Sequence, residues 1–226
     1  MNEQFDRTIG LIGEDNFFKI QEKTIAVIGL GGVGGTALEA LVRTGFKHFA
    51  LIDFDTVDIT NLNRQILYTS EDVNKLKVEA AKKRVLSINP NCDVTTYNLK
   101  INEQNIYTLS KIDFIIDAID DTKGKIAITK FASEHHIPII VSLGMAKKKE
   151  PSCLKIIRLD KTTTDPLARK LRYEMKKVGI DTSKIMSVYS TEVVEQNGAK
   201  LNSLMMVPSS AGLLIVSYVL DYLLKE

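Results

Sequence analysis

A glycine-rich stretch, "GLGGVG", follows the short apolar run "TIAVI" near the start of the chain. Gly29, Gly31 and Gly34 have the spacing G-x-G-x-x-G, and Gly32 adds freedom for a close approach of the backbone. Between a strand and a helix, such glycines let the backbone contact a phosphate, and the helix N-terminus supplies partial positive charge. We therefore expect a nucleotide-binding turn; the alternative is a tight turn without a ligand. The glycines alone do not distinguish a nicotinamide cofactor from ATP.

A second polar group follows the next predicted strand and bears on that choice. Asp53 lies nineteen residues after Gly34, and an acid there can accept hydrogen bonds from the ribose of either NAD or ATP. The stretch "DFDTVDITNLNRQ" then supplies four donors, which are Asn61, Asn63, Arg64 and Gln65. A dinucleotide needs an apolar adenine slot here, whereas a triphosphate needs charge-assisted donors. This stretch favours ATP, although Arg64 by itself is also compatible with a salt bridge that braces the loop.

Two charged residues further along extend the same pattern. Lys77 lies on the next predicted helix, and Asp120 ends the run "FIIDAID". A parallel sheet presents functional carboxylates beyond the carboxyl ends of its strands. At such a place Asp120 can hold magnesium, which bridges phosphate oxygens and neutralises their charge. For Lys77 alone, a solvated helix face is the simpler interpretation.

These residues need a scaffold that brings strand ends together. Short runs rich in Ile, Val and Phe predict strands, and stretches with helical spacing alternate with them. The predicted strands are residues 24–29, 48–53, 94–99, 113–118 and 137–143, and the predicted helices are 35–45, 70–90 (capped by Ser70) and 123–136. This alternation indicates an α/β, Rossmann-like, doubly wound and mainly parallel sheet, whose ligands bind beyond the carboxyl ends of the strands.

After Leu143 the pattern changes to strand, helix and strand, at residues 152–159, 165–179 and 184–191. Asn197-Gly198 predicts a turn before an apolar terminal helix. We expect this segment to be built onto the sheet as a C-terminal α+β extension. Residues 1–226 are then a single domain, with a nucleotide-binding core at 1–145 and a basic extension with the terminal helix at 146–226.

The composition is that of an ordinary folded protein, with 44% hydrophobic and 26% charged residues. The first residues lack the basic start and apolar run of a signal peptide, and Cys92 and Cys153 form no C-x-x-C pair. We therefore expect a cytoplasmic protein without zinc. The apolar stretch "AGLLIVSYVLDYLL" is short for a membrane span and Asp221 interrupts it. We expect a buried helix there and no stable membrane insertion.

Charge is spread unevenly along the chain, whose net charge is only +2. From Lys147 to Lys184 there are twelve Lys or Arg against five Asp or Glu, a local balance of +7. The remaining residues carry 18 basic and 23 acidic side chains, a balance of −5. This asymmetry is typical of a segment with a polyanionic partner, and a solvated helix face is the alternative.

The motifs "GLGGVG", "LIDFDTVDITNLNRQ", "KLKVEAA" and "DAIDD", in this order, resemble the adenylating domain of the ubiquitin-activating-enzyme superfamily across roughly residues 5–143. The resemblance implies binding of ATP and Mg2+. It assigns Asp53 to the ribose of ATP, Arg64 and Lys77 to the phosphates, and Asp120 to magnesium. The other nucleotide-binding residues that it implies are Gly29, Gly31, Gly32, Gly34, Asn61, Asn63, Gln65 and Asp121. The N-terminal "FDRTIG" is similar to the family element whose arginine enters the partner subunit's active site, which implies a catalytic Arg7 and a homodimer.

The later motifs indicate which branch of the superfamily the chain resembles. It lacks the two C-x-x-C pairs of many sulfur-carrier activators and the catalytic cysteine domain of the eukaryotic enzymes. The stretches "KTTTDPLARKLRYEMKKVGI", "VYSTE" and "VPSSAGLLIVSYVLDYL" instead resemble the branch that dehydrates threonylcarbamoyladenosine in tRNA. Asp121, where many relatives have asparagine, fits this branch. Thr164 stands where some members have cysteine, so no thiol at that position can carry the chemistry.

The branch implies an ATP-dependent cyclisation of the modified adenosine through an acyl adenylate, with a possible sulfur-transfer protein as a partner. It also gives the basic segment a function, because a ridge of cations on the predicted helix can neutralise RNA phosphates. The residues of this ridge are Arg169, Lys170, Arg172, Lys176 and Lys177, whereas Leu167, Leu171, Met175 and Val178 are expected to face the core. Three alternatives stay open: activation of a ubiquitin-like sulfur carrier, a nicotinamide-dependent oxidoreductase, and a scaffold without catalysis.

Overall fold

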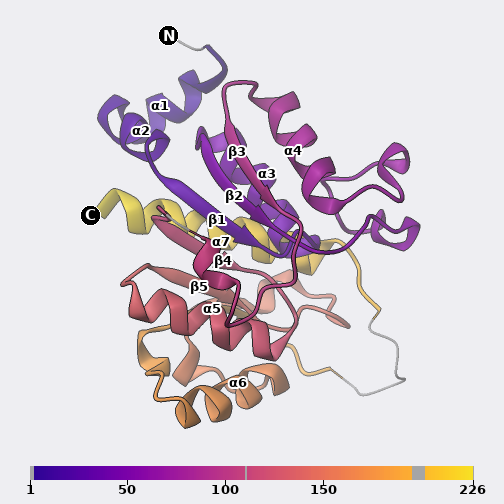
Figure 1. The fold of residues 1–226 in the computed structure, drawn as a ribbon, viewed down its shortest axis with the longest axis vertical. Helices are drawn as coiled ribbons and strands as arrows, with labels where there is room; N and C mark the ends of the chain where they lie inside the picture. Colours follow the sequence, from indigo (N-terminus) through magenta and orange to yellow (C-terminus); the bar gives the residue numbers. More distant parts are fainter. Residues whose placement is uncertain (1–2, 110, 195–201, 226) are drawn as a thin grey trace.

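A seven-stranded sheet forms the centre of the computed structural model, which describes residues 3–109, 111–194 and 202–225 (Figure 1). The strands follow the order β3-β2-β1-β4-β5-β7-β6, and every neighbouring pair is parallel except β6 and β7. Their bounds are β1 Thr24–Ile28, β2 His48–Ile52, β3 Asp93–Tyr97, β4 Phe114–Asp117, β5 Ile139–Ser142, β6 Leu154–Arg158 and β7 Met186–Ser190. The sequence-based prediction of a mainly parallel α/β sheet is confirmed.

Helices cover both faces of this sheet because successive side chains of a strand point to opposite sides. In β1, Ile25 and Val27 join one hydrophobic core, whereas Ala26 and Ile28 join the other. The first core is closed by α1 (Asp6–Ile12), α2 (Glu14–Gln21), α3 (Gly32–Thr44), α4 (Lys77–Ile88) and α7 (Met206–Lys225). The second is closed by α5 (Thr122–Glu134) and α6 (Pro166–Lys177). The central strands are therefore buried on both faces, which explains their continuous apolar runs.

The predicted helix at residues 70–90 is shorter in the structure, and this prediction was wrong at its N-terminal end. Residues Ser70–Asp72 form a separate 3-10 turn, in which the Asp72 carboxylate accepts hydrogen bonds from the backbone and hydroxyl of Thr69. Asn74 then has a left-handed backbone with φ of 70°, which no helix can continue. The helix α4 therefore begins at Lys77, after Leu76 as its cap. The predicted turn at Asn197-Gly198 lies outside the described residues.

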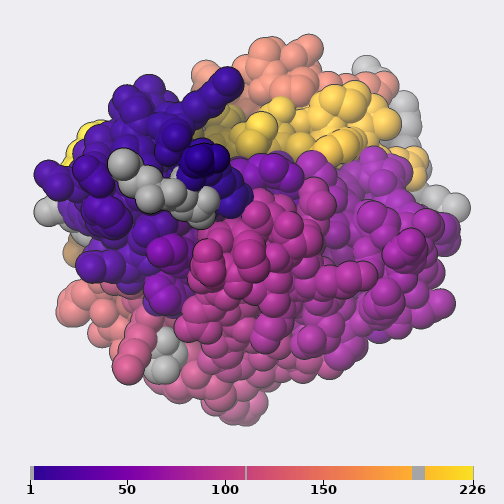
Figure 2. Space-filling model, turned by 90° about the horizontal axis from the view of Figure 1, so that it is seen from above, coloured from indigo at the N-terminus to yellow at the C-terminus, as the bar shows by residue number. Residues whose placement is uncertain are grey.

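The C-terminal part continues the sheet. Strand β7 pairs with β5 in parallel, and β6 adds an antiparallel edge. Among the described residues, α7 is the one helix long and apolar enough to cross a membrane by length and composition. It packs closely on α3 at Gly212. A Cβ added at this position would lie only 2.6 Å from the carbonyl oxygen of Val33, so the contact requires glycine. Figure 2 shows part of α7, in yellow, at the surface beside the N-terminal segment in indigo.

Candidate active site

A cavity of about 340 Å3 opens at the carboxyl ends of β1, β2 and β4. The chain runs outward from β1 through β2 to β3, and in the opposite direction from β4 to β5. This reversal between β1 and β4 is the topological switch point at which doubly wound sheets bind ligands. The cavity is lined by Ile28, Gly29, Gly31, Gly32, Ile52, Asp53, Phe54, Asp55, Asn61, Arg64, Gln65, Lys77, Leu99, Lys100, Ile101, Ala118, Ile119, Asp120 and Asp121.

The glycines of the first loop divide into two kinds. A Cβ added at Gly29 would lie 2.8 Å from the carbonyl carbon of Ala118, and one at Gly34 would lie 1.9 Å from the carbonyl oxygen of Gly29. These two positions must be glycine for the turn and the start of α3 to pack together. A Cβ at Gly31, by contrast, would meet only the side-chain nitrogen of Gln65, at 3.9 Å. Gly31 therefore leaves open space at the N-terminus of α3, where an anion is favoured.

Asp53 is held in a fixed orientation at the end of β2. It is 8% exposed, and its carboxylate accepts hydrogen bonds from the backbone nitrogen of Leu30 at 2.7 Å and of Asp55 at 2.9 Å. An ionised carboxylate offers about four acceptor positions, so these two contacts leave capacity for a ligand. The predicted ribose acceptor thus lines the cavity and is already oriented there.

The loop that carries the predicted amides and arginine is braced by its own side chains. Asp58 and Asn61 form a reciprocal cap on the turn at residues 59–61. The guanidinium of Arg64 donates to the carbonyl oxygen of Thr60 and to the side-chain oxygen of Asn63, both at 2.9 Å. Gln65 is buried, and within the described part of the chain its side-chain oxygen is an acceptor without a hydrogen-bond partner. Such an orphaned acceptor in a cavity wall is suited to a donor from a ligand.

Lys77 is the first residue of α4 and is not on a solvated face. It is 5% exposed, and its ammonium lies 2.8 Å from the Asp55 carboxylate at the cavity wall. The structure therefore removes the simpler interpretation of this residue as one surface lysine among many. A cation in the wall of the same cavity as the N-terminus of α3 can contact a phosphate.

The two neighbouring acids after β4 have different environments. Asp120 is exposed and lines the cavity. Asp121 also lines it, but its carboxylate caps α5 by accepting a hydrogen bond from the backbone nitrogen of Gly124 at 2.7 Å. Asp120 is thus the acid available for a ligand, and Asp121 has a structural task in addition.

Three of the predicted residues lie apart from the cavity. Gly34 lies within α3 and Asn63 donates to the carbonyl oxygen of Ser203, so neither lines the wall. Arg7 is an exposed residue of α1 and does not line the cavity of its own chain. Its predicted entry into a partner's site stays a prediction.

Residues that the sequence reasoning missed complete the wall on the side of β3. Leu99, Lys100 and Ile101 follow this strand, and the Lys100 ammonium lies 5.5 Å from the centre of the Phe54 ring. A signal existed, because the segment after a third parallel strand must reach the same edge of the sheet as Asp53. This wall is apolar with one cation, which suits a nucleobase.

A buried ion pair behind the cavity was also missed. The Lys125 ammonium of α5 lies 2.9 Å from the Asp117 carboxylate at the end of β4, and both side chains are fully buried. The same Asp117 oxygen accepts a hydrogen bond from the backbone nitrogen of Ile119 at 3.3 Å. Burial raises the pKa of Asp117, and the nearby Lys125 opposes that rise. This pair fixes the segment that leads to Asp120.

The basic helix α6 is only partly the ridge that was predicted. Leu171 and Met175 are fully buried, whereas Val178 is 50% exposed, so the expectation that Val178 faces the core was wrong. The helix ends at Lys177, which leaves Val178 beyond its regular turn. The exposed cations on α6 are Arg169, Lys170, Lys176 and Lys177.

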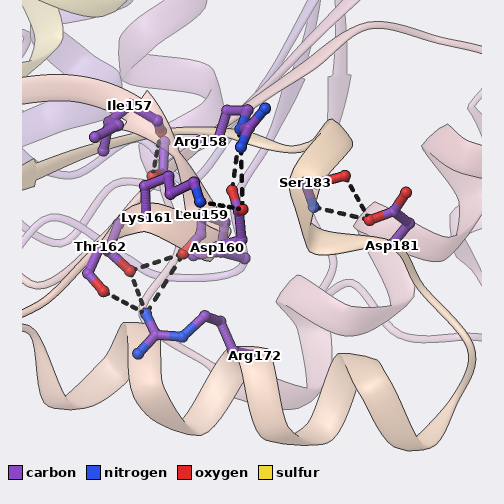
Figure 3. Close-up of polar contacts among 10 residues, drawn as sticks. Ile157, Arg158, Leu159, Asp160, Lys161, Thr162, Arg172, Asp181 and Ser183 are labelled. Atoms are coloured by element: carbon purple, nitrogen blue, oxygen red, sulfur yellow. Dashed lines mark hydrogen bonds and ion pairs between the residues drawn. The ribbon is translucent and has the colours of Figure 1, made fainter.

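Arg172 of α6 is turned toward the protein (Figure 3). Its guanidinium donates to the carbonyl oxygen of Thr162 at 3.0 Å, to the Thr162 hydroxyl, and to the carbonyl oxygen of Leu159 at 3.4 Å. Arg158 and Asp160 pair nearby, with a distance of 3.1 Å between side-chain nitrogen and oxygen. Arg172 therefore joins α6 to the turn after β6, and its predicted contact with RNA competes with this role.

Comparison with known proteins places these features in a family. The model of the ThiF family matches residues 5–222. A tRNA threonylcarbamoyladenosine dehydratase from Bacillus subtilis (strain 168) is 35% identical over 246 residues, which cover 100% of this chain and 96% of the relative. The crystal structure of the Escherichia coli tRNA N6-threonylcarbamoyladenosine dehydratase in complex with ATP has a TM-score of 0.93 and 33% identity, covering 99% of this chain and 94% of that one. The chain therefore belongs to the ThiF family.

Proposed function

We propose that this protein is an enzyme that uses ATP to dehydrate N6-threonylcarbamoyladenosine in tRNA to its cyclic form, through an acyl adenylate. The observation that carries the proposal is the convergence of Gly31, Asp53, Arg64, Lys77 and Asp120 on one cavity at the switch point of the sheet. The names of the similar Bacillus subtilis and Escherichia coli proteins, and the ATP in the latter's crystal structure, support the same substrates.

The cavity orients ATP along the edge of the sheet. Asp53 accepts hydrogen bonds from the ribose, next to the apolar wall after β3. The phosphates extend toward Gly31 and the N-terminus of α3, where Arg64 and Lys77 supply charge-assisted donors. Both cations already have acceptors in this structure, so binding exchanges those acceptors for phosphate oxygens.

The donor set also fits Mg2+ bound together with phosphate. No cluster of three or more His, Cys, Asp or Glu that could hold a metal by itself exists among the described residues. Mg2+ in nucleotide sites commonly takes one or two carboxylates plus substrate phosphates and water, and the exposed Asp120 can supply one carboxylate. The ion would contribute neutralisation of phosphate charge.

The reaction then has two substitutions. The threonyl carboxylate attacks the α-phosphorus of ATP, the bond between this phosphorus and the α,β-bridging oxygen breaks, and pyrophosphate leaves with that oxygen. A carbamoyl nitrogen of the same nucleoside attacks the activated carbonyl carbon, loses its proton, and displaces AMP, which carries away the carboxylate oxygen. The nucleoside is thereby lighter by one water. Arg64 and Lys77 stabilise the charge that develops on the departing pyrophosphate, and the second step is favoured because both groups belong to one molecule.

The remaining parts of the proposal concern the partners, the location and the domain organisation of the enzyme. The exposed cations Arg169, Lys170, Lys176 and Lys177 hold the phosphates of tRNA, so that binding weakens as salt rises. Arg7 enters the active site of the second copy in a homodimer. The enzyme works in the cytoplasm as one adenylating domain that comprises the core at 1–145 and the extension at 146–226, and a sulfur-transfer protein is a further candidate partner.

The test uses tRNA from cells that lack this protein. The purified enzyme is incubated with that tRNA, ATP and magnesium, the product is digested gently at neutral pH, and the nucleosides are weighed by mass spectrometry. We expect a threonylcarbamoyladenosine peak lighter by one water, formed only with ATP and not by the Arg64→Ala or Asp120→Ala variants. An unchanged nucleoside with a substrate tRNA proven by a second dehydratase would reject the proposal.

A further inference from the structure

A second cavity, of about 560 Å3, lies at the carboxyl ends of β5 and β7. Its volume is within the range of sites for small organic ligands. The wall consists of Gly144, Ala146, Lys147, Lys148, Thr164, Asp165, Pro166, Leu167, Glu192, Val193 and Val194. None of these residues lines the first cavity, so the two hollows have separate walls.

The second cavity lies between the first cavity and the basic helix. Strand β5 is the parallel neighbour of β4, and the segments that follow these two strands carry Gly144 and Asp120 respectively. Neighbouring strands are about 4.8 Å apart, so the two openings lie side by side along the same edge of the sheet. The wall also contains Pro166 and Leu167, which begin α6, the helix with the exposed cations.

One side of this cavity is a buried ion pair. The Lys148 ammonium lies 3.5 Å from the Asp165 carboxylate, with side-chain exposures of 7% and 2%. Asp165 also accepts hydrogen bonds from the backbone nitrogens of Gly144 at 3.2 Å and Ala168 at 2.9 Å. The carboxylate is therefore held in place by three groups. An ammonium has three donors, and its contact with Asp165 engages one of them, so Lys148 is a fixed cation that retains donors for oxygen atoms in the cavity.

The cavity wall also contains apolar residues. Val193 lines the wall with 80% of its surface exposed, and Ala146, Pro166 and Leu167 also line it. The adjacent Lys147 has a left-handed backbone with φ of 63°, and its backbone nitrogen donates to the carbonyl oxygen of Asn202 at 2.8 Å. Strained backbone of this kind is retained where the surroundings enforce it, often at binding sites. A cavity lined by both apolar side chains and a buried cation suits a planar base with a polar substituent.

We infer that the second cavity receives the modified base of the tRNA, with Lys148 donating to oxygen atoms of the threonylcarbamoyl group. This inference rests on the proposed function and adds to it a site for the second substrate. The exposed cations of α6 hold the flanking phosphates at the mouth of the cavity. The base stacks on the apolar residues, and the threonyl carboxylate extends across the ends of β5 and β4 toward the ATP beside Asp120.

Two variants test the site from opposite sides, each with a matched control. Ala146→Phe fills the cavity, and its control Ser87→Phe adds the same bulk at an exposed position of α4. Lys148→Met removes the cation, and its control Lys155→Met removes an exposed lysine of β6. Steady-state turnover of threonylcarbamoyladenosine-bearing tRNA gives KM for tRNA, and calorimetric titration with ATP gives the ATP Kd. We expect both cavity variants to raise the KM for tRNA by about tenfold or more, while their ATP Kd and both controls stay within about twofold of wild type.

Further variants separate recognition from folding. Lys148→Arg keeps the charge and is expected to recover most of the lost affinity for tRNA. Val193→Asp changes a side chain that is already exposed, so it leaves the fold intact, and it is expected to raise the KM for tRNA even if Ala146→Phe fails to fold. A wild-type enzyme that makes the dehydrated nucleoside while Lys148→Met and Val193→Asp keep the wild-type KM would overturn this inference alone. A wild-type enzyme that makes no dehydrated nucleoside would overturn the proposed function, and the inference with it.

Discussion

Two lysine–aspartate pairs at the same edge of the sheet have nearly equal lengths and very different surroundings. The pair of Lys77 with Asp55 is 2.8 Å long, and that of Lys125 with Asp117 is 2.9 Å long. In each, a helix supplies the lysine, and the aspartate lies at or just after the end of a strand. The first pair has side-chain exposures of 7% and 47%, whereas both members of the second are fully buried.

The difference indicates that access to a cavity, and not distance, separates a structural pair from one that can serve a ligand. Lys125 is fully buried, so a phosphate cannot reach it. Its attraction to Asp117 serves instead to offset the cost of burying both charges. Lys77 and its half-exposed partner Asp55 both line the first cavity. Water or an anion can therefore take the place of Asp55 beside the Lys77 ammonium. One pair therefore fixes the chain behind the site, and the other supplies a cation within it.

The largest expected effect comes from breaking the enclosed pair. Lys125→Met leaves Asp117 buried without a counter-charge, which should lower the free energy of unfolding by about 3–5 kcal/mol. Urea denaturation followed by circular dichroism measures this loss. The double variant Asp117→Leu with Lys125→Met removes both charges and should recover part of the stability. A loss below about 1 kcal/mol for Lys125→Met would mean that the enclosed pair is no more important than a surface one.

Breaking the cavity pair should affect turnover more than stability. Lys77→Met removes the cation that we propose contacts the phosphates and should lower kcat by about a hundredfold, as the loss of a transition-state donor does elsewhere. The remaining Asp55 is 47% exposed and hydrated, so the unfolding free energy should change by about 1 kcal/mol or less. The matched control is Lys75→Met, which removes a half-exposed lysine two residues earlier. Wild-type turnover by Lys77→Met would exclude this lysine from the chemistry.

The comparison also explains which features could be predicted from the sequence. Asp53 and Asp120 each follow an apolar run, and parallel strands bring such positions to one edge, so the cavity could be predicted without coordinates. The pairing of Lys125 could not, because a lysine in a helix is usually solvated and only tertiary packing encloses it. Lys100 was missed for a related reason, since it lies on an irregular segment that has no periodicity of its own.

Arg172 shows the same limit on the other side of the molecule. Its position on the helix predicted a member of the exposed ridge of cations, and nothing in the spacing marks Thr162 as its acceptor. The Leu159 carbonyl oxygen already accepts hydrogen bonds from the backbone nitrogen and hydroxyl of Thr162, so Arg172 adds a further donor there and also donates to the carbonyl oxygen of Thr162. A charged residue at the border of a helix face is therefore assigned to solvent or protein only by the packing of neighbouring segments.

An intermediate case sharpens the contrast between enclosed and accessible charges. Glu39 of α3 is 6% exposed, and its carboxylate accepts hydrogen bonds from Arg43 and from Arg84 of α4. Burial raises the pKa of Glu39, but the hydrogen bonds and charges of Arg84 and Arg43 outweigh it, so the pKa is lowered overall. The ionised Glu39 therefore adds to the free energy of unfolding. This contribution is fully present above the usual glutamate pKa of about 4.3 and is lost as pH falls through the lowered pKa.

Glu39→Gln should therefore cost about 1 kcal/mol at pH 7, and the difference from wild type should shrink as the pH falls below about 4. Urea denaturation at a series of pH values measures both curves. The matched control is Glu71→Gln, which makes the same change at an exposed position. Its free energy of unfolding should follow the wild-type dependence on pH. A difference between wild type and Glu39→Gln that grows toward acid would have the wrong sign for a lowered pKa and would reject this account.

The smallest expected effect is also the one that tests the comparison most directly. Asp55→Asn keeps the shape of the cavity pair and removes its negative charge. The enclosed pair would not tolerate such a change, whereas here the cavity lets water solvate Lys77, so the free energy of unfolding should fall by less than about 1 kcal/mol. The ammonium also loses a competitor for phosphate, and one negative charge no longer repels ATP. The ATP Kd, measured by calorimetric titration, should consequently stay equal or decrease by less than about tenfold.

If Asp55→Asn instead destabilised the protein as much as Lys125→Met does, the two pairs would have the same role despite their different exposure. If it weakened ATP binding strongly, Asp55 itself would hold part of the nucleotide or its metal, and Lys77 would not be the cation that exchanges partners.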